Sequence, residues 1–157
     1  MAFAFADLHR GDANRYSWIP PFDWSRNYDH DRWWNELREL DDDPWFVQVL
    51  HAGTEVARLG LDDSIEINHY AGVSDIGSEG LEIQFFEVTT EARGKGIGTQ
   101  VIQQFARRHP DRRLLAYSER ADAFWASLGW SGHMPPDYDP DHEDPSTLFI
   151  APLDWPA

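Results

Sequence analysis

A strand, a glycine-rich loop and a helix follow one another in the middle of the chain, and this unit constrains the fold more than any other segment. Residues Leu81–Val88 alternate between apolar and polar side chains, with the period of two that predicts a β-strand. The segment Arg93–Thr99 then carries three alternating glycines. From Ile97 onwards the apolar residues recur at helical spacing, and Pro110 stops the pattern. The sequence therefore predicts a strand that leads through a tight loop into a helix.

The glycine loop predicts an anion-binding site. Glycine lacks a Cβ atom, so the backbone can approach a ligand closely or adopt positive φ. The first N–H groups of a helix have no partners inside it, and a phosphate or pyrophosphate is their natural ligand. A P-loop is excluded because its Gly-Lys-Ser/Thr ending is missing, and Thr99 stands where a dinucleotide-binding fingerprint has its third glycine. The alternative is a tight strand-to-helix turn without a ligand.

The remaining segments predict a single domain of the mixed α/β (α+β) class. A length of 157 residues suits one domain. Residues 11–27 are predicted as an aromatic-rich loop, and residues 131–146 as a loop rich in Pro and Asp. Further strands are predicted at Ala2–Leu8, Trp45–Leu50, Thr54–Leu61 (with an extension at Ile65–Asn68), Arg113–Tyr117 and Thr147–Ile150, and further helices at Asp31–Leu40, with Trp33, Leu37 and Leu40 on its buried face, and at Arg120–Leu128.

The charge of the chain argues against two classes of partner. It has 28 Asp and Glu residues against 13 Lys and Arg, a formal net charge of −15. Such a chain repels the phosphates of nucleic acids and the surface of anionic membranes. The absence of cysteine excludes disulfides and thiolate metal sites. The first residues lack the basic leader and the long apolar run of a signal or membrane-spanning segment, so we expect a cytoplasmic protein.

Two segments resemble the motifs of the GCN5-related N-acetyltransferase (GNAT) family. In the glycine loop, Arg93, Gly96 and Gly98 fill the Arg/Gln-x-x-Gly-x-Gly/Ala pattern of acyl-CoA binding. The second segment, Ala121–Trp130, is similar to the family's Ala-x-x-Phe-Tyr-x-x-x-Gly-Phe pattern. The resemblance implies the GNAT fold, a central twisted mixed sheet of about six to seven strands flanked by helices. In that fold the fourth and fifth strands splay apart.

The resemblance also implies a site for acetyl-CoA as co-substrate. Pantetheine would enter between the splayed strands and bond to the backbone of Phe86 and Val88, as an added strand does. The pyrophosphate would rest on the loop amides, with positive charge from Arg93 and Lys95. Ser118 would contact the cofactor or, as an alternative, cap the following helix. The cofactor-binding residues expected from the resemblance are Phe86, Val88, Arg93, Gly94, Lys95, Gly96, Ile97, Gly98, Thr99, Ser118 and Trp125.

The resemblance implies a candidate general base, but the family's usual general acid is missing from this chain. Some family members carry a catalytic glutamate on the fourth strand where this chain has Glu82, with Glu87 as the second choice. The alternative is that Glu82 only forms the polar side of a strand. The usual general acid is a tyrosine, but Trp125 occupies its place, and an indole N–H does not transfer protons near neutral pH. Tyr117 is the substitute acid, unless it only packs or the thiolate leaves without a dedicated acid.

The expected activity is acetyl transfer from acetyl-CoA to a primary amine, either a small cationic molecule or a peptide amine. Acidic segments 29–43 and 137–144 would attract such an acceptor, and aromatic residues would pack against it, namely Trp18, Trp24, Trp33 and Trp34. The rival interpretations are a CoA-binding sensor or assembly subunit without catalysis, and the transfer of another acyl group. We expect a monomer or homodimer.

No metal ion is expected. The acidic run 137–144 superficially resembles a calcium loop, but His142 replaces the EF-hand glycine and Leu148 replaces the bidentate glutamate. The run is therefore interpreted as a solvated loop.

Overall fold

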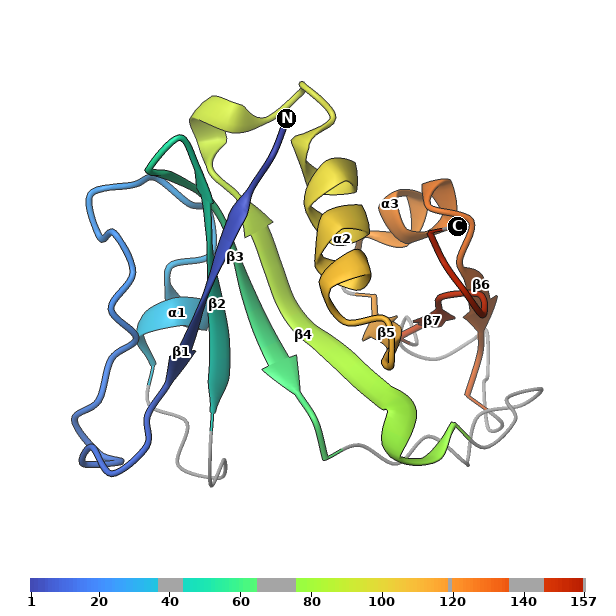
Figure 1. Cartoon of the computed structure of the whole chain (residues 1–157), viewed down its shortest axis with the longest axis horizontal. Helices are drawn as coiled ribbons and strands as arrows, with labels where there is room; N and C mark the ends of the chain where they lie inside the picture. The colour runs from blue at the N-terminus through green and yellow to red at the C-terminus, as the bar shows by residue number, and fades with distance from the viewer. Residues whose placement is uncertain (37–43, 65–75, 119, 136–145, 157) are drawn as a thin grey trace, which may run out of the picture. The chain divides into compact units, whose positions relative to one another are not determined.

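A computed structural model describes residues 1–36, 44–64, 76–118, 120–135 and 146–156 (Figure 1). In these ranges seven strands form one sheet, in the order β1-β2-β3-β4-β5-β7-β6. The strands are β1 (Ala4–His9), β2 (Trp45–His51), β3 (Thr54–Asp62), β4 (Gly80–Val88), β5 (Arg113–Tyr117), β6 (Ser131–His133) and β7 (Leu148–Ile150). The helices are α1 (Arg32–Asn35), α2 (Ile97–Arg108) and α3 (Asp122–Ser127), with short 3-10 helices η1 (Gly77–Glu79) and η2 (Thr90–Ala92). The predicted mixed α/β class is confirmed.

The chain divides into two compact units, and each is described by itself. The first unit comprises Met1–Asp62 and Gln84–Phe105, and the second comprises Asp63–Ile83 and Ala106–Ala157. β4 and α2 therefore contribute residues to both units. The predicted strand extension at 65–68 and the acidic run 137–144 lie outside the described residues.

The first unit contains a hairpin formed by two of the predicted strands, β2 and β3. β2 pairs with β1 and with β3, in both cases antiparallel. The turn between β2 and β3 consists of Ala52 and Gly53, both at positive φ (49° and 81°). Two successive residues at positive φ are typical of the turns that match the twist of a β-hairpin. His51 and Thr54 form the last residue pair before this turn.

An aromatic cluster forms much of the core of the first unit. Phe22, Trp34 and Phe46 are buried together, and the Phe22 and Trp34 rings meet edge-on with centroids 5.6 Å apart. Phe22 belongs to the predicted aromatic-rich loop, and Phe46 lies on β2. Burial of the loop's aromatic side chains therefore fixes residues 18–34 against the sheet, because large apolar rings gain most by leaving water.

The helix predicted at Asp31–Leu40 is much shorter in the structure. It ends at Asn35, because the backbone of Glu36 is extended, with φ −81° and ψ 142°. Trp34 is the side chain that α1 buries, at 1% exposure, whereas Trp33 is half-buried and stacks on His30. Trp33 also packs against the core cluster of Phe22, Trp34 and Phe46. Residues 37–43, with Leu37 and Leu40, lie outside the described part.

The strand–loop–helix unit is present as predicted. β4 leads through η2 and the glycine loop into α2, drawn in yellow to orange in Figure 1. The predicted apolar face of α2 is buried: Val101, Ile102 and Phe105 are completely inaccessible, and Ile97 nearly so. Arg107 and Arg108 lie in the last helical turn, where positive charge stabilises the negative end of the helix dipole.

The second unit is built around β5. Its core cluster consists of Leu115, Leu148 and Ile150, supplied by β5 and β7, which pair antiparallel. The start of β4 pairs with β5 in parallel, from Gly80 opposite Arg113 to Glu82 opposite Leu115. Both strands continue past these three pairs, as the predicted splay of the fourth and fifth strands requires.

The prediction of a loop over residues 131–146 is wrong at its beginning. Ser131–His133 forms β6, which pairs antiparallel with β7. The strand is too short to show an alternating pattern, so its formation depends on the partner strand. Gly132 allows the close approach, because a Cβ there would lie 3.1 Å from the Phe149 ring. No described helix is long and apolar enough to cross a membrane.

Candidate functional site

The glycine loop projects from the first unit between η2 and α2. Gly94 and Gly96 adopt φ of 77° and 72°, in the left-handed region that favours glycine. An added Cβ would meet no atom within 4 Å at either position, so the backbone conformation, not crowding, requires glycine. Residues 93–96 are exposed, while the buried side chain of Ile97 anchors the end of the loop.

The first turn of α2 presents backbone N–H groups to this loop. Gln100 N–H donates to the Gly96 carbonyl at 3.3 Å, which begins the helical hydrogen bonding. The amides of Ile97, Gly98 and Thr99 precede this bond, at the end where N–H groups lack acceptors inside the helix. The positive end of the helix dipole lies at the same place. This arrangement suits a phosphate or pyrophosphate.

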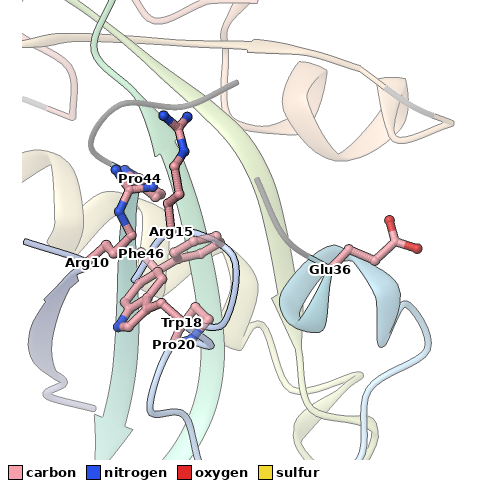
Figure 2. Close-up of a pocket in the computed structure, with 7 residues that line it drawn as sticks. All are labelled: Arg10, Arg15, Trp18, Pro20, Glu36, Pro44 and Phe46. Carbon is pink, nitrogen blue, oxygen red and sulfur yellow. The ribbon is translucent and has the colours of Figure 1, made fainter. Parts of the chain in front are cut away.

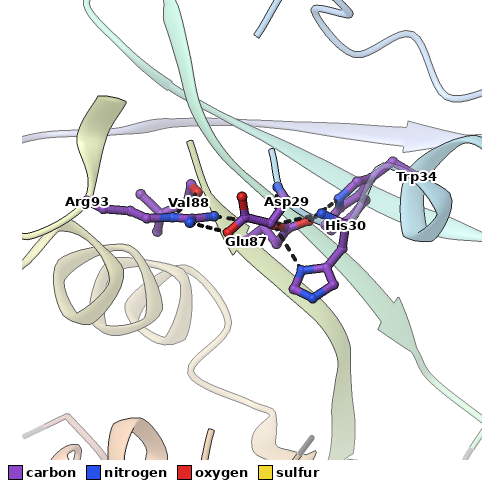
Figure 3. A network of polar contacts seen from close by, with 6 residues as sticks. All are labelled: Asp29, His30, Trp34, Glu87, Val88 and Arg93. Carbon is purple, nitrogen blue, oxygen red and sulfur yellow. Dashed lines mark hydrogen bonds and ion pairs between the residues drawn. The ribbon is translucent and has the colours of Figure 1, made fainter. Parts of the chain in front are cut away.

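Arg93 and Lys95, the two predicted sources of positive charge, differ in their surroundings. Lys95 is exposed, and among the described residues it forms no ion pair. Arg93 instead contacts three oxygen atoms of the protein (Figure 3). Its Nε donates to the Val88 carbonyl at 3.2 Å, one terminal nitrogen donates to Asp29, and the other lies 3.5 Å from Glu87.

Glu87 is buried, and its carboxylate accepts from the segment that begins α1. The N–H groups of Asp29 and His30 donate to it at 3.0 and 3.2 Å, and the indole Nε1–H of Trp34 donates at 2.9 Å. His30 Nδ1 also lies 3.2 Å from the carboxylate. The predicted second choice for the general base thus has its oxygens engaged by protein donors. Its evident role is to hold residues 29–34 against β4.

Glu82 and Tyr117 lie in the second unit. Glu82 is half-buried near the start of β4, opposite Leu115 in the parallel register. Tyr117 ends β5 and packs partly buried against the Leu115, Leu148 and Ile150 cluster. This contact is the one expected if Tyr117 packs in the core, and its role as a general acid stays a prediction.

Ser118 bonds to Ala121, the N-cap residue that immediately precedes α3, and among the described residues no side-chain hydrogen bond caps α3 from the N-cap position itself. Its hydroxyl oxygen accepts the N–H of Ala121 at 3.1 Å, and its own N–H donates to the Thr147 carbonyl at 2.9 Å. The side chain is buried. These bonds fix the turn that leads from β5 into α3.

Trp125, at the position of the family's tyrosine, is part of an aromatic stack in the second unit. Its ring is 5% exposed and lies nearly parallel to Trp130, with centroids 5.0 Å apart. Trp155 meets Trp130 edge-on, and its indole N–H donates to the Leu128 carbonyl at 2.9 Å. The contacts of Trp125 are thus those of a core side chain.

Two of the four tryptophans predicted to receive a cationic acceptor surround a cation of the protein itself. The guanidinium of Arg58 lies 4.8 Å from the Trp24 ring centre and 6.0 Å from that of Trp34. Tyr28 and Phe22 are closer still, at 4.0 and 4.5 Å. Sequence reasoning missed this cluster, although a signal exists: Arg58 interrupts the apolar run of β3 at a central strand position.

Trp18 borders a small pocket of the first unit (Figure 2). The pocket is lined by Arg10, Arg15, Trp18, Pro20, Glu36, Pro44 and Phe46. Two of these residues, Glu36 and Pro44, flank residues 37–43, which lie outside the described part. Within the described ranges, no group of three or more His, Asp or Glu side chains is placed to hold a metal ion.

Comparison with known proteins gives a family and a fold. The family described as the acetyltransferase (GNAT) family matches residues 10–130. No curated protein matches the chain. An acetyltransferase from Thermus thermophilus is 18% identical with a TM-score of 0.51, over 73% of this chain and 68% of that one. The Bacillus subtilis N-acetyltransferase YlbP, solved in complex with coenzyme A, is 18% identical with a TM-score of 0.50, over 71% and 69%. These likenesses show the predicted fold.

Proposed function

Because the chain belongs to the acetyltransferase (GNAT) family, we propose that it moves an acetyl group from acetyl-CoA to a primary amine. The observation that carries this proposal is the glycine loop, which is exposed at residues 93–96 and leads, with positive φ at Gly94 and Gly96, into the first amides of α2. The coenzyme A bound to the Bacillus subtilis N-acetyltransferase of similar fold supports the same cofactor here. In this proposal both units form a single acyltransferase domain.

The cofactor is proposed to bind along β4 and the glycine loop. The loop amides and Lys95 hold the pyrophosphate, and pantetheine bonds to the β4 backbone near Phe86 and Val88. The net charge of −15 does not oppose this, because backbone dipoles at short range do most of the binding.

The proposed chemistry is direct attack by the amine. An alkylamine has a pKa of about 10.4 and is mostly protonated at neutral pH, so a base must first take one proton from it. We assign this step to Glu82, directly or through water. The neutral nitrogen then attacks the thioester carbonyl and the C–N bond forms. The nitrogen gives up its second proton to water, and the C–S bond breaks. The thiolate takes a proton from Tyr117, which water then reprotonates, or directly from water. A β4 backbone N–H near Phe86 or Val88 stabilises the oxyanion.

The acceptor is proposed to be cationic, because the chain carries an excess of carboxylates. Trp24 and Trp34 are not part of its binding surface in this proposal, since they enclose Arg58. Trp18 and Trp33 are the remaining aromatic candidates, and the exposed carboxylate of Asp31 lies near Trp33 in sequence, at the start of α1.

One observation supports a second function, a CoA-binding sensor or assembly subunit without catalysis. Trp125 replaces the tyrosine that would protonate the thiolate, and it is packed into the core of the second unit. Such a protein would keep the glycine loop and bind CoA without turnover.

The two functions are separated by thiol release. A thiol reagent reports free CoA with no protein background, because the chain has no cysteine. We expect release from acetyl-CoA with at least one amine of a panel of small cationic amines and peptides. Thermal stabilisation by CoA without thiol release, from acetyl-CoA or other acyl-CoA donors, supports the sensor instead. No stabilisation by millimolar CoA contradicts both.

A further inference from the structure

Glu87 is the residue at which three segments of the first unit meet, namely β4, residues 29–34 and the start of the glycine loop (Figure 3). Its side chain is only 4% exposed, and Arg93 is the basic side chain of the glycine loop that reaches it. The same carboxylate accepts from Trp34 and from the N–H of Asp29. Glu87 thus links the loop's first residue to the segment that begins α1.

Arg93 has a protein oxygen at each of its three nitrogens. These oxygens belong to the Val88 carbonyl, the Asp29 carboxylate and the Glu87 carboxylate. The guanidinium therefore points back along β4 and not into the loop. Contact with a phosphate on the loop amides would require Arg93 to leave these partners, whereas Lys95 is exposed in the same loop.

We propose, on the premise that the loop binds CoA as argued above, that Arg93 and Glu87 are positioning residues for the cofactor. Their ion pair fixes the first residue of the loop against β4 and residues 29–34, and so sets the direction of the loop amides. Lys95, not Arg93, supplies side-chain charge to the phosphates. Arg93, the first residue of the motif, therefore affects CoA binding by orienting the loop together with Glu87, and not by contacting the phosphates.

For the variant Glu87→Gln, this role predicts a change in CoA affinity opposite to the change that electrostatics alone predicts. Glu87 is a negative charge near an anion site, so its neutralisation alone would strengthen CoA binding. If Glu87 positions the loop, Glu87→Gln instead weakens CoA binding, because the amide no longer holds Arg93 as an ion pair. The substitution is nearly isosteric, and its amide oxygen can still accept from Trp34 Nε1–H.

The test is CoA affinity by calorimetry at several salt concentrations, for the wild type, Glu87→Gln, Arg93→Gln, Arg93→Lys and Lys95→Gln. We expect Glu87→Gln and Arg93→Gln to weaken binding several-fold while its salt dependence stays that of the wild type. Lys95→Gln, the matched control in the same loop, should flatten the salt dependence, since a screened contact is removed. Arg93→Lys should not restore affinity, because an ammonium cannot bridge three acceptors in a planar fork.

A measurement without CoA completes the test. Hydrogen exchange of the amides of residues 94–99 should be faster in Glu87→Gln and Arg93→Gln than in the wild type, and unchanged in Lys95→Gln. Tighter CoA binding by Glu87→Gln, restoration by Arg93→Lys, or a flattened salt dependence in Arg93→Gln overturns the positioning role alone. Absence of CoA binding by the folded wild type instead removes the proposed function, and this inference with it.

Discussion

Arg58 donates from its Nε to the Glu55 carboxylate at 2.9 Å, and both residues are 1% exposed. Glu55 also accepts from the Tyr28 hydroxyl and from the Gln48 amide, each at 2.9 Å. The second terminal nitrogen of Arg58 donates to the Asp23 carbonyl. This buried pair on β3 therefore holds residues 23–28 against the sheet, and through them the segment that reaches Glu87.

Removal of one member of this pair should destabilise the protein strongly. Arg58→Met leaves the Glu55 carboxylate buried without its counter-charge, and we expect the free energy of unfolding to fall by about 3–5 kcal/mol. Urea unfolding followed by tryptophan fluorescence measures this change. The double variant Glu55→Gln with Arg58→Met should lose less than Arg58→Met alone. If the double variant is less stable than Arg58→Met, the stability lost in Arg58→Met is not caused by the unpaired charge of Glu55.

Tyr28 should make stability depend on alkaline pH. Burial, and then the nearby Glu55 carboxylate, raise the pKa of its phenol. Because the folded pKa lies above the unfolded value of about 10, the contribution of the neutral phenol is complete below that pH and is lost above it. We expect Tyr28→Phe to be about 1–3 kcal/mol less stable than the wild type at neutral pH, since a hydrogen bond to a carboxylate is lost.

The difference between these two proteins should shrink as the pH rises through about 10. Melting temperatures of both, measured side by side from neutral to alkaline pH, test this. Two curves that fall in parallel would show that Tyr28 ionises as readily in the folded protein as in the unfolded chain.

The strand–loop–helix unit was predictable because its signals are local. The bounds of β5 follow from residues 113–117 themselves, and the buried face of α2 follows from the spacing of Ile97, Val101, Ile102 and Phe105. β6 was missed because three residues carry no periodicity, and the strand exists only through pairing with β7. Likewise nothing local in the sequence shows that Glu36 is extended and ends α1.

The orientation of side chains within the site was beyond the sequence for a different reason. The motif identifies Arg93, but its direction depends on Glu87 and Asp29, which approach it only in the folded chain. The same holds for Trp24 and Trp34, which contact Arg58 of β3 with their ring faces only in the folded chain. Residue type indicates which chemistry is available, and tertiary contacts decide which ligand uses it.

Glu82 should be essential if it is the proton acceptor. Glu82→Gln keeps the size of the side chain and removes its basicity, and we expect kcat to fall by about 100-fold or more, since general bases contribute factors of this order. The Km for acetyl-CoA should stay close to that of the wild type. Steady-state thiol release measures both. Gln84→Ala, an exposed position on the same strand face, is the control, and wild-type kcat in Glu82→Gln places the base elsewhere.

Gly96 should be required for CoA binding because of its backbone conformation. Its φ of 72° is one that L-residues adopt at a cost of about 1–2 kcal/mol, and no atom lies near enough to clash with a new methyl group. Gly96→Ala should therefore fold, but with a loop that either keeps the strain or turns its amides away. In both cases we expect CoA affinity to fall, and calorimetry measures the loss.

Gly53→Ala provides the matched control, because Gly53 has φ of 81°, is also free of near neighbours, and lies in the turn between β2 and β3. The two variants should lose similar stability in thermal unfolding, since each carries the same backbone strain. Only Gly96→Ala should lose CoA affinity, because Gly96 lies in the loop whose amides form the anion site, whereas Gly53 does not. Equal loss of affinity in both variants would attribute the effect to general destabilisation, and wild-type affinity in Gly96→Ala would show that CoA does not depend on this turn of the loop.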